Sequence, residues 1–483
     1  MSNDPAVRPA AILVGIQLPG VSDAEHEADL AELGRLVHTL GYTAVANVTQ
    51  KRAAVGNGMI LGAGKLQELA ALTGGTGVVT SGAKKQKSKA RLKWEAEEEE
   101  RAAAAGDPAP DFEGDEVADG DDDDVEALDG EADDAAADET PDASEKPTLV
   151  VVNHELSPNQ LSILERATGV GVVDRTGVIV DIFHRHARSR EARLQVEIAR
   201  LNYLSPRMRQ STGSTERQQG RGAGDSAVEL DRRRIRDRLA ELREGLAAIQ
   251  AEQDHRRRAR RDELRVALVG YTNAGKSSLM RALTGREVLV ADQLFATLDT
   301  TVRALQPETR PRILVSDTVG FIQKLPHDLV ASFRSTLAEA LEASLLLYVV
   351  DASDPSFEAQ LKVTRDVLAE IGAQDLPSRL LLNKVDRLSA EDRATLALRF
   401  PDAIFLSAHA AEDVSQLRDT LIAFFDASMV EADLVIPYAR QSRIGEVYDN
   451  ARVVSEEYDE HGRRLRVRAL PGAMAKLQQA FPA

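Results

Sequence analysis

The stretch GYTNAGKS, from Gly270 to Ser277, fits the pattern G-x-x-x-x-G-K-[ST]. It follows the apolar run RVALV and precedes SSLMRAL, a run compatible with a helix. Glycines in such a loop let the backbone wrap around phosphate oxygens, and amides from about Ala274 to Ser278 point at them from the helix start. We therefore expect a phosphate-binding loop in which Lys276 reaches the β- and γ-phosphates and the Ser277 hydroxyl ligates Mg²⁺.

A second motif, DTVG at 317–320, follows the apolar run RILVS. In phosphoryl-transfer proteins a carboxylate at such a strand end holds Mg²⁺, and nearby backbone groups meet the terminal phosphate. We expect Asp317 to hold the ion, directly or through a water, and the Gly320 amide to contact the γ-phosphate.

A third motif, NKVD at 383–386, ends another predicted strand. A fourth motif, SAH at 407–409, ends the last predicted strand of this region. The Asp386 carboxylate can accept two hydrogen bonds from the N1 and N2 hydrogens of guanine, whereas adenine offers no matching pair. An unpaired carboxylate facing adenine is heavily penalised, so the motif rejects ATP. We expect Asn383 to brace the loop, Lys384 to lie along the base, and the Ala408 amide to reach guanine O6.

Four ordered motifs at strand ends predict a Mg²⁺-dependent GTPase that converts GTP and water to GDP and phosphate. The expected nucleotide-binding residues are Gly270, Tyr271, Thr272, Asn273, Ala274, Gly275, Lys276, Ser277, Ser278, Asp317, Thr318, Val319, Gly320, Asn383, Lys384, Asp386, Ser407, Ala408 and His409.

The segment DQLFATLDTTVR lies between the first two motifs, where a threonine must close over Mg²⁺ and the γ-phosphate. Thr297 is our choice, and Thr300 and Thr301 remain open as alternatives. The expected Mg²⁺ ligands are Ser277, Thr297 and Asp317, and the expected catalytic residues are Lys276, Thr297 and Gly320.

Composition limits the class of protein. At 483 residues the chain is long enough for about three domains, with 43% hydrophobic residues and no cysteine. The lack of cysteine excludes a disulfide scaffold, a thiol nucleophile and a Cys-ligated metal site. No apolar run approaches the roughly 18–20 residues of a membrane span, and the N-terminus lacks a basic leader. We expect a cytoplasmic monomer, with a peripheral membrane location left open.

The net charge of −18 is concentrated in one segment. Residues 95–147 contain 24 acidic residues against two basic ones, a local charge of −22, so the rest of the chain carries +4. The segment has too little apolar content to offset chain ordering, and we expect it to be disordered. The run KKQKSKARLKW just before it either keeps the loop solvated or marks a basic surface that the acidic segment shields from nucleic acid.

Residues 190–262 show the pattern of a helical hairpin. Apolar residues recur at spacings of 4 and 3 in both arms, namely Leu194, Ile198 and Leu201, then Ile235, Leu239, Leu242, Leu246 and Ile249. Residues 207–227 between the arms are rich in Gly, Ser, Gln and Arg, which predicts a basic tip loop. Arginine clusters in the second arm are either a solvated face or a contact for RNA phosphates.

Strand-like and helix-like patterns alternate in two further regions, which predicts a multidomain α/β protein. We expect an α/β N-terminal domain over 1–188, the hairpin over 189–262, and a parallel sheet flanked by helices over 263–428. A small α+β domain of ferredoxin-like type is expected over 429–483.

Several stretches together resemble the HflX GTPases, within the group that includes Obg. In the nucleotide-binding region these are GYTNAGKS, LFATLD and DTVGFI; before it they are LSPNQ, DRTGVIVDIFHRHARSREARLQVEIARLNYL and VELDRRRIR. The resemblance covers nearly the whole chain apart from the acidic segment. It implies a GTPase whose N-terminal domain and hairpin loop 207–227 bind ribosomal RNA of the large subunit, and which splits or rescues stalled ribosomes under stress.

Two features depart from the family pattern. The hairpin loop reads GRGAGD over 220–225, where the family has Gly-x-Arg-Gly-Pro-Gly-Glu, so this loop lacks the stiffening proline. The acidic segment interrupts the domain that is expected to face RNA, and it must swing clear because phosphates would repel it.

Phe321 follows the DTVG motif, at the place where a Ras-type switch uses glutamine to orient the attacking water. Its side chain neither donates nor accepts a hydrogen bond. We expect slow intrinsic hydrolysis that accelerates when a ribosome orders the switch loops. K⁺ is a second candidate activator, because Asn273 occupies the loop position at which related cation-activated GTPases keep an asparagine ligand.

Two other functions remain open. The first is a nucleotide-dependent signalling switch that binds a protein, in which the basic hairpin only oligomerises. The second is an acidic chaperone for basic proteins, based on residues 95–147.

Overall fold

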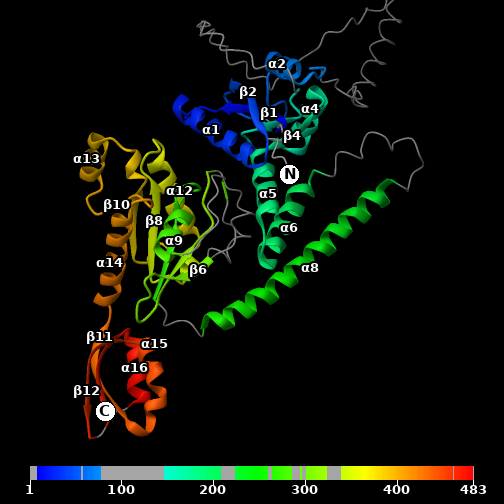
Figure 1. The fold of residues 1–483 in the computed structure, drawn as a ribbon. Helices are drawn as coiled ribbons and strands as arrows, with labels where there is room; N and C mark the ends of the chain where they lie inside the picture. The colour runs from blue at the N-terminus through cyan, green and yellow to red at the C-terminus, as the bar shows by residue number, and fades with distance from the viewer. Residues whose placement is uncertain are drawn as a thin grey trace, which may run out of the picture.

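The computed structural model describes residues 8–55, 58–77, 146–207, 224–258, 264–285, 294–295, 301–323, 339–460 and 462–481. Within these ranges the chain forms three β-sheets with their own helices and a long helical hairpin (Figure 1). This arrangement confirms the expected multidomain α/β architecture.

The first sheet is parallel, with strand order β2–β1–β3–β4. The strands are β1 (Ala10–Gln17), β2 (Thr43–Lys51), β3 (Leu149–Val152) and β4 (Gly171–Asp174). Helices α1 (Asp23–Thr39) and α5 (Arg175–His186) pack on one face, and α2 (Ala63–Thr73) and α4 (Pro158–Thr168) on the other. Because both faces are covered, β1 is buried along its full length.

Local capping signals position the two helices that later meet the phosphate-binding loop. Ser22 caps α1 in a capping box with Glu25. The Asp174 carboxylate caps α5 by accepting from the Gly177 amide at 2.8 Å. Since Asp174 also ends β4, the first residue of α5, Arg175, is held at the carboxyl edge of the sheet.

The predicted helical hairpin is confirmed. Helices α6 (Arg190–Leu204) and α8 (Gly224–Arg258) share an apolar seam in which Ile198, Leu239 and Leu242 are buried. At 1.5 Å per residue, the 35 residues of α8 extend for about 50 Å.

The hairpin turn differs from the prediction at one end. Residues 208–223 lie outside the described residues, but the chain is already helical from Gly224, inside the predicted loop 207–227. Glycine is common in loops and favours a helix break, whereas here the helix-forming residues that follow Gly224 extend α8 back to it.

The second sheet carries the nucleotide motifs and has strand order β10–β9–β8–β5–β7–β6. Its strands are β5 (Leu264–Val269), β6 (Thr301–Ala304), β7 (Ile313–Asp317), β8 (Leu345–Asp351), β9 (Ser378–Asn383) and β10 (Ile404–Phe405). Helices α9 (Lys276–Thr284) and α14 (Ala411–Ala427) cover one face, while α12 (Phe357–Glu370) and α13 (Ala390–Arg399) cover the other.

One strand of this sheet is antiparallel. β6 pairs with β7 in the antiparallel sense at the edge, whereas all other neighbours are parallel. The apolar runs predict the five parallel strands, but they predict no strand at 301–304. An edge strand with one partner needs no continuous apolar run, so the hydrophobic pattern that revealed the inner strands is missing there.

The two sheets are joined by a shared core. One apolar cluster contains Leu33 of α1 and Phe183 of α5 together with Tyr271, Phe295 and Phe321 of the nucleotide-binding region. Phe183 and Phe295 meet edge to face with ring centroids 4.6 Å apart. The α1–α5 face of the first sheet is therefore packed directly against the nucleotide motifs.

The C-terminal unit has an antiparallel sheet of order β11–β13–β12, formed by β11 (Val430–Pro437), β12 (Arg452–Asp459) and β13 (Gly462–Ala469). Helices α15 (Ile444–Asn450) and α16 (Pro471–Ala480) share its core. The described residues form strand, helix, two strands and helix, which is the small α+β unit that the sequence predicts, although a full ferredoxin-like pattern has a fourth strand.

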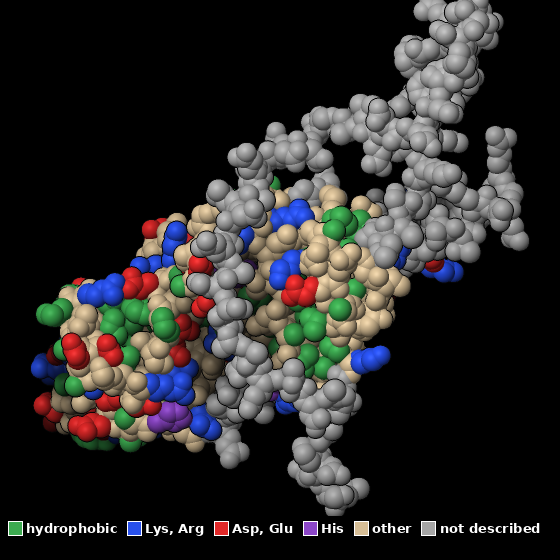
Figure 2. Space-filling model, turned by 90° about the horizontal axis from the view of Figure 1, so that it is seen from above, with side chains coloured by type: hydrophobic (Ala, Val, Ile, Leu, Met, Phe, Trp, Pro, Cys, Tyr) green, Lys and Arg blue, Asp and Glu red, His purple; other side chains and the backbone are tan. Residues whose placement is uncertain are grey.

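Basic and acidic side chains are interspersed over the face of the molecule seen from above (Figure 2). Among the described helices, none is long and apolar enough to span a membrane.

Candidate functional site

The phosphate-binding loop connects β5 to α9. Gly275 has φ +94°, and a Cβ there would lie 2.2 Å from Asn383 Nδ2, so the close approach of these two segments requires glycine. α9 begins at Lys276, which directs its first amides toward the loop. The loop thus has the glycine-lined helix start that phosphate binding needs.

Lys276 is buried beneath this loop. Its Nζ donates to the carbonyls of Gly270 at 2.9 Å and Tyr271 at 2.8 Å. Burial lowers the pKa of Lys276 to about 8, although the negative charge of Asp317 opposes the shift. The ammonium group therefore lies at the loop centre, where phosphates are expected.

Ser277 and Asp317 form the predicted metal end of the site. The Ser277 hydroxyl donates to Asp317 Oδ2 at 2.7 Å, and Asp317 is fully buried at the end of β7. A hydroxyl and a carboxylate brought together from two elements are the hard oxygen donors that Mg²⁺ prefers, so the residues present fit the ion. When bound, Mg²⁺ would neutralise charge on the β- and γ-phosphate oxygens.

The DTVG motif lies directly against the loop. A Cβ at Gly320 would be 2.8 Å from Thr272 Cγ2 and 3.1 Å from Lys276 Nζ. The Phe321 amide donates to the Gly270 carbonyl at 3.1 Å, and the Thr272 amide donates to the Phe321 carbonyl at 2.8 Å. These contacts hold the predicted γ-phosphate contact, Gly320, at the mouth of the loop.

Asn383 links three of the motifs. Its Nδ2 donates to the Ala274 carbonyl at 2.9 Å, and its Oδ1 accepts from the Ala408 amide at 3.1 Å. The side chain is 1% exposed. The bracing geometry expected for Asn383 is therefore present between the phosphate loop, the NKVD motif and the SAH motif.

Lys384 bonds to the phosphate loop and to a carboxylate outside the four motifs. Its Nζ donates to the Asn273 carbonyl at 2.7 Å and to Asp351 Oδ2 at 2.6 Å. Asp351 ends β8, and a carboxylate at the end of a buried strand beside other functional strand ends was the signal that could have revealed it.

Asp386 is exposed where the guanine base is expected. The Ser407 hydroxyl hydrogen-bonds to it and lowers its pKa below the usual range, which keeps the carboxylate ionised. The Ser407 Oγ also accepts from the His409 amide at 3.3 Å. An ionised, outward-facing carboxylate suits recognition of the two guanine N–H groups.

The chain is similar to known GTPases over most of its length. Family models match residues 186–260 (GTP-binding GTPase Middle Region), residues 265–384 (50S ribosome-binding GTPase), and residues 27–81 with 134–184 (GTP-binding GTPase N-terminal). The GTPase HflX of Gluconacetobacter diazotrophicus is 64% identical over 475 residues, covering 98% of each chain. The chain belongs to the HflX family of GTPases.

A more distant curated relative and a solved structure are also similar to this chain. The GTPase HflX of Escherichia coli is 38% identical over 323 residues, which cover 65% of this chain and 75% of the relative. Among solved structures, a GTP-binding protein from Sulfolobus solfataricus in complex with GDP is similar, with 20% identity and a TM-score of 0.41. The matched region covers 86% of this chain and 99% of the chain in that structure.

Of the three threonines that could close over Mg²⁺ in this HflX GTPase, the structure describes one. Thr297 and Thr300, two of the three candidates for closing over Mg²⁺, lie outside the described residues. Thr301 is described and begins the edge strand β6, opposite Asp317 of β7. The choice among these threonines stays a prediction.

Two residues of the HflX phosphate loop face the N-terminal sheet unit, one through a hydrogen bond and one across a cavity. The Tyr271 side chain turns away from the loop and donates to Glu32 of α1 at 2.6 Å, a contact that the motif alone did not reveal. Asn273, the predicted K⁺ ligand, is exposed with φ +61° and lines a cavity of about 310 Å³ together with Arg35 and His38 of α1.

Proposed function

We propose that this HflX GTPase binds the large ribosomal subunit, couples GTP binding and hydrolysis to that association, and splits or rescues stalled ribosomes. The observation that carries the proposal is the family match of residues 265–384, the segment that holds the phosphate loop, to the model described as a 50S ribosome-binding GTPase.

The hairpin supplies a surface suited to an RNA partner. Arg232, Arg233, Arg234 and Arg236 are exposed at one end of α8, next to the predicted basic tip loop. Phosphate oxygens attract such clusters, and arginine matches their geometry with paired donors. A rigid helix of about 50 Å can carry these arginines well away from the nucleotide site.

The buried position of Phe321 supports the proposal that a partner controls hydrolysis. Its side chain is 2% exposed and packs in the core shared with α1 and α5, so it is not available to orient a water. We infer that intrinsic hydrolysis is slow and that the large subunit accelerates it by ordering the switch loops. Lys276, Gly320 and Thr297 remain the proposed catalytic residues.

K⁺ is the second activator that we propose. The exposed Asn273 lies beside the phosphate loop, and amide oxygens are suitable ligands for a hard cation. Turnover at saturating GTP should be higher in K⁺ than in Na⁺ at equal ionic strength, and Asn273→Ala should remove the difference. Equal turnover of the unmodified protein in the two salts would reject this activator.

Ribosome binding is tested by co-sedimentation with large subunits in the presence of a non-hydrolysable GTP analogue, GDP or no nucleotide. We expect the protein to pellet with subunits mainly in the GTP-analogue sample. If the protein stays in the supernatant in all three samples, the proposal is contradicted. Nucleotide-dependent capture of a protein, with turnover unaffected by ribosomes, would instead support the signalling switch.

A charge reversal identifies the contact surface. Arg233→Glu on α8 should weaken subunit binding and reduce the slope of log affinity against log salt by about one. Lys362→Glu is the matched control, because Lys362 is also an exposed basic residue on a helix but lies on α12. Equal effects of the two variants would show that α8 is not the contact.

A further inference from the structure

The Tyr271 hydroxyl joins three segments of the chain. It donates to Glu32 Oε2 of α1 at 2.6 Å and accepts from the Gln323 amide at 2.7 Å. Tyr271 belongs to the phosphate loop, and Gln323 lies three residues after Gly320. The hydroxyl therefore connects the phosphate loop, the N-terminal sheet unit and the segment after the DTVG motif.

Arg175 completes the connection. Its Nη1 donates to Asn153 Oδ1 at 3.0 Å, and its Nη2 donates to both Glu32 and the Gln323 carbonyl, the latter at 3.2 Å. The amide of Gln323 is thus bonded to Tyr271 and its carbonyl to Arg175. Both backbone polar groups of this one residue are fixed by side chains that lead to α1 and α5.

The side chains of Glu32, Arg175 and Tyr271 are almost excluded from water. Glu32 is 5% exposed, Arg175 is 3% exposed and Tyr271 is 3% exposed. A buried ion pair is weak evidence for stability, because desolvation offsets much of its attraction. Its fixed geometry can instead orient the groups that it contacts.

We propose that the Tyr271 hydroxyl is a positioning group for GTP hydrolysis, through which the buried Glu32–Arg175 pair holds the segment after Gly320 against the phosphate loop. The segment is held at both ends: Phe321 bonds to Gly270 and Thr272, and Gln323 bonds to Tyr271 and Arg175. A γ-phosphate contact that is already in place needs less rearrangement when charge develops during hydrolysis.

The inference rests on the predicted role of Gly320 but not on the ribosomal partner. Hydrolysis is measured without ribosomes, so failure of the ribosome proposal would leave it unaffected. It also differs from a general packing role, which would affect folding and not the handling of the γ-phosphate.

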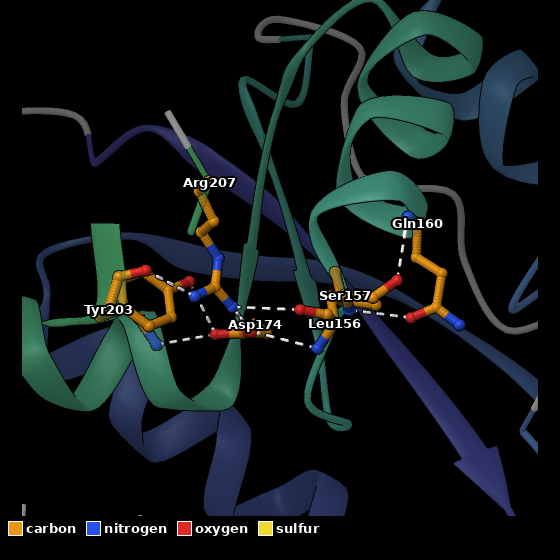
Figure 3. A network of polar contacts seen from close by, with 7 residues as sticks. Leu156, Ser157, Gln160, Asp174, Tyr203 and Arg207 are labelled. Carbon is orange, nitrogen blue, oxygen red and sulfur yellow. Dashed lines mark hydrogen bonds and ion pairs between the residues drawn. The ribbon is translucent and has the colours of Figure 1, made fainter. Parts of the chain in front are cut away.

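A second tyrosine, Tyr203 near the end of α6, provides a matched control. The Tyr203 hydroxyl donates to Asp174 Oδ1 at 2.8 Å, and Asp174 is fully buried and ion-paired with Arg207 at 2.7 Å (Figure 3). This group has the same chemistry as the first, a tyrosine on a buried carboxylate paired with arginine. It fixes the loop-side end of α6 to Leu156, and none of its hydrogen bonds among the described residues reaches a nucleotide motif.

The test compares Tyr271→Phe with Tyr203→Phe in the full chain. For Tyr271→Phe we expect kcat to fall about tenfold, the factor that corresponds to one ordinary hydrogen bond in the transition state, with the Kd for GDP unchanged. Affinity for a non-hydrolysable GTP analogue should fall relative to GDP, because only the analogue carries a γ-phosphate. Tyr203→Phe should leave kcat and the ratio of the two affinities unchanged.

The proposal is overturned if Tyr271→Phe retains the original kcat, or if both variants lower kcat equally. Hydrogen exchange followed by mass spectrometry gives an independent readout. Peptides that contain residues 321–323 should exchange faster in Tyr271→Phe and at the original rate in Tyr203→Phe. Arg175→Lys keeps the charge beside Glu32 but has a single nitrogen at its end, so it should show a smaller loss of kcat; an unchanged kcat there would also count against the proposal.

Discussion

At the scale of single residues, Gly320 leaves no room for a side chain between the DTVG motif and the phosphate loop. Because an added methyl group would collide with Thr272 and approach Lys276, Gly320→Ala must move the motif outward. We predict that affinity for a non-hydrolysable GTP analogue falls at least about tenfold, whereas affinity for GDP is retained. Titration with fluorescent nucleotides would show this, and an equal loss for both nucleotides would contradict it.

Lys276 gives the site a pH dependence. In the protein without nucleotide its pKa is lowered to about 8, and the negative phosphates of a bound nucleotide must raise that pKa. Below pH 8 the lysine is already charged, so binding takes up no proton there. Between pH 8 and the ordinary lysine range, the free protein is neutral at this position and binding takes up a proton.

We therefore predict that GTP affinity falls as the pH rises above about 8. Calorimetry at pH 9 in buffers of different ionisation enthalpy should report proton uptake on binding in this range. The Lys276→Arg variant, which keeps its charge at pH 9, should show no uptake from this position. Equal proton counts at pH 7 and pH 9 in the unmodified protein would contradict the prediction.

How far sequence predicts a residue's surroundings depends on whether the motif itself makes the contact. The bracing contacts of Asn383 could be predicted, because they join backbone segments whose positions the fold fixes. The contact between Tyr271 and Glu32 could not, since these residues are 239 positions apart and nothing in GYTNAGKS shows which helix will cover it. The same holds for Arg175, which reads as an ordinary helix residue.

At the scale of elements, the hairpin seam could be predicted from spacing alone. Leu242 of α8 is 2% exposed in that seam, whereas Leu230 on the same helix is 53% exposed. Leu242→Ala should lower the free energy of unfolding of the hairpin by about 2–5 kcal/mol, and Leu230→Ala by much less. Faster hydrogen exchange in α8 of Leu242→Ala only would support this, and equal exchange in both variants would not.

The edge strand β6 and the start of α8 could not be predicted, for different physical reasons. β6 is held by one neighbour and needs no apolar run. The end of a helix in a glycine-rich segment depends on small differences in propensity that spacing does not reveal.

At the scale of the whole molecule, the acidic segment 95–147 lies mostly outside the described residues, between α2 and β3 of the first sheet. It is remote in sequence from every nucleotide motif. Replacing it with a short neutral linker should leave intrinsic GTP hydrolysis unchanged. Because replacement of the segment removes a net charge of −22 and so reduces repulsion from phosphates, subunit binding should become tighter at low salt. Loss of GTPase activity on this replacement would contradict the prediction.

The order of domains followed from charge and hydrophobic alternation, but their packing did not. The core that joins α1 and α5 to Phe295 and Phe321 combines residues that each read as parts of separate units. This packing buries the Phe321 side chain, and we propose for that reason that hydrolysis depends on a partner that orders the loops around the nucleotide.

The most direct test is the rate of GTP hydrolysis at saturating GTP with and without purified large ribosomal subunits. We predict a slow rate for the protein alone and an increase of at least about tenfold with subunits, reduced in Arg233→Glu and retained in Lys362→Glu. The same rate in the presence and absence of large subunits would contradict a ribosome-controlled GTPase.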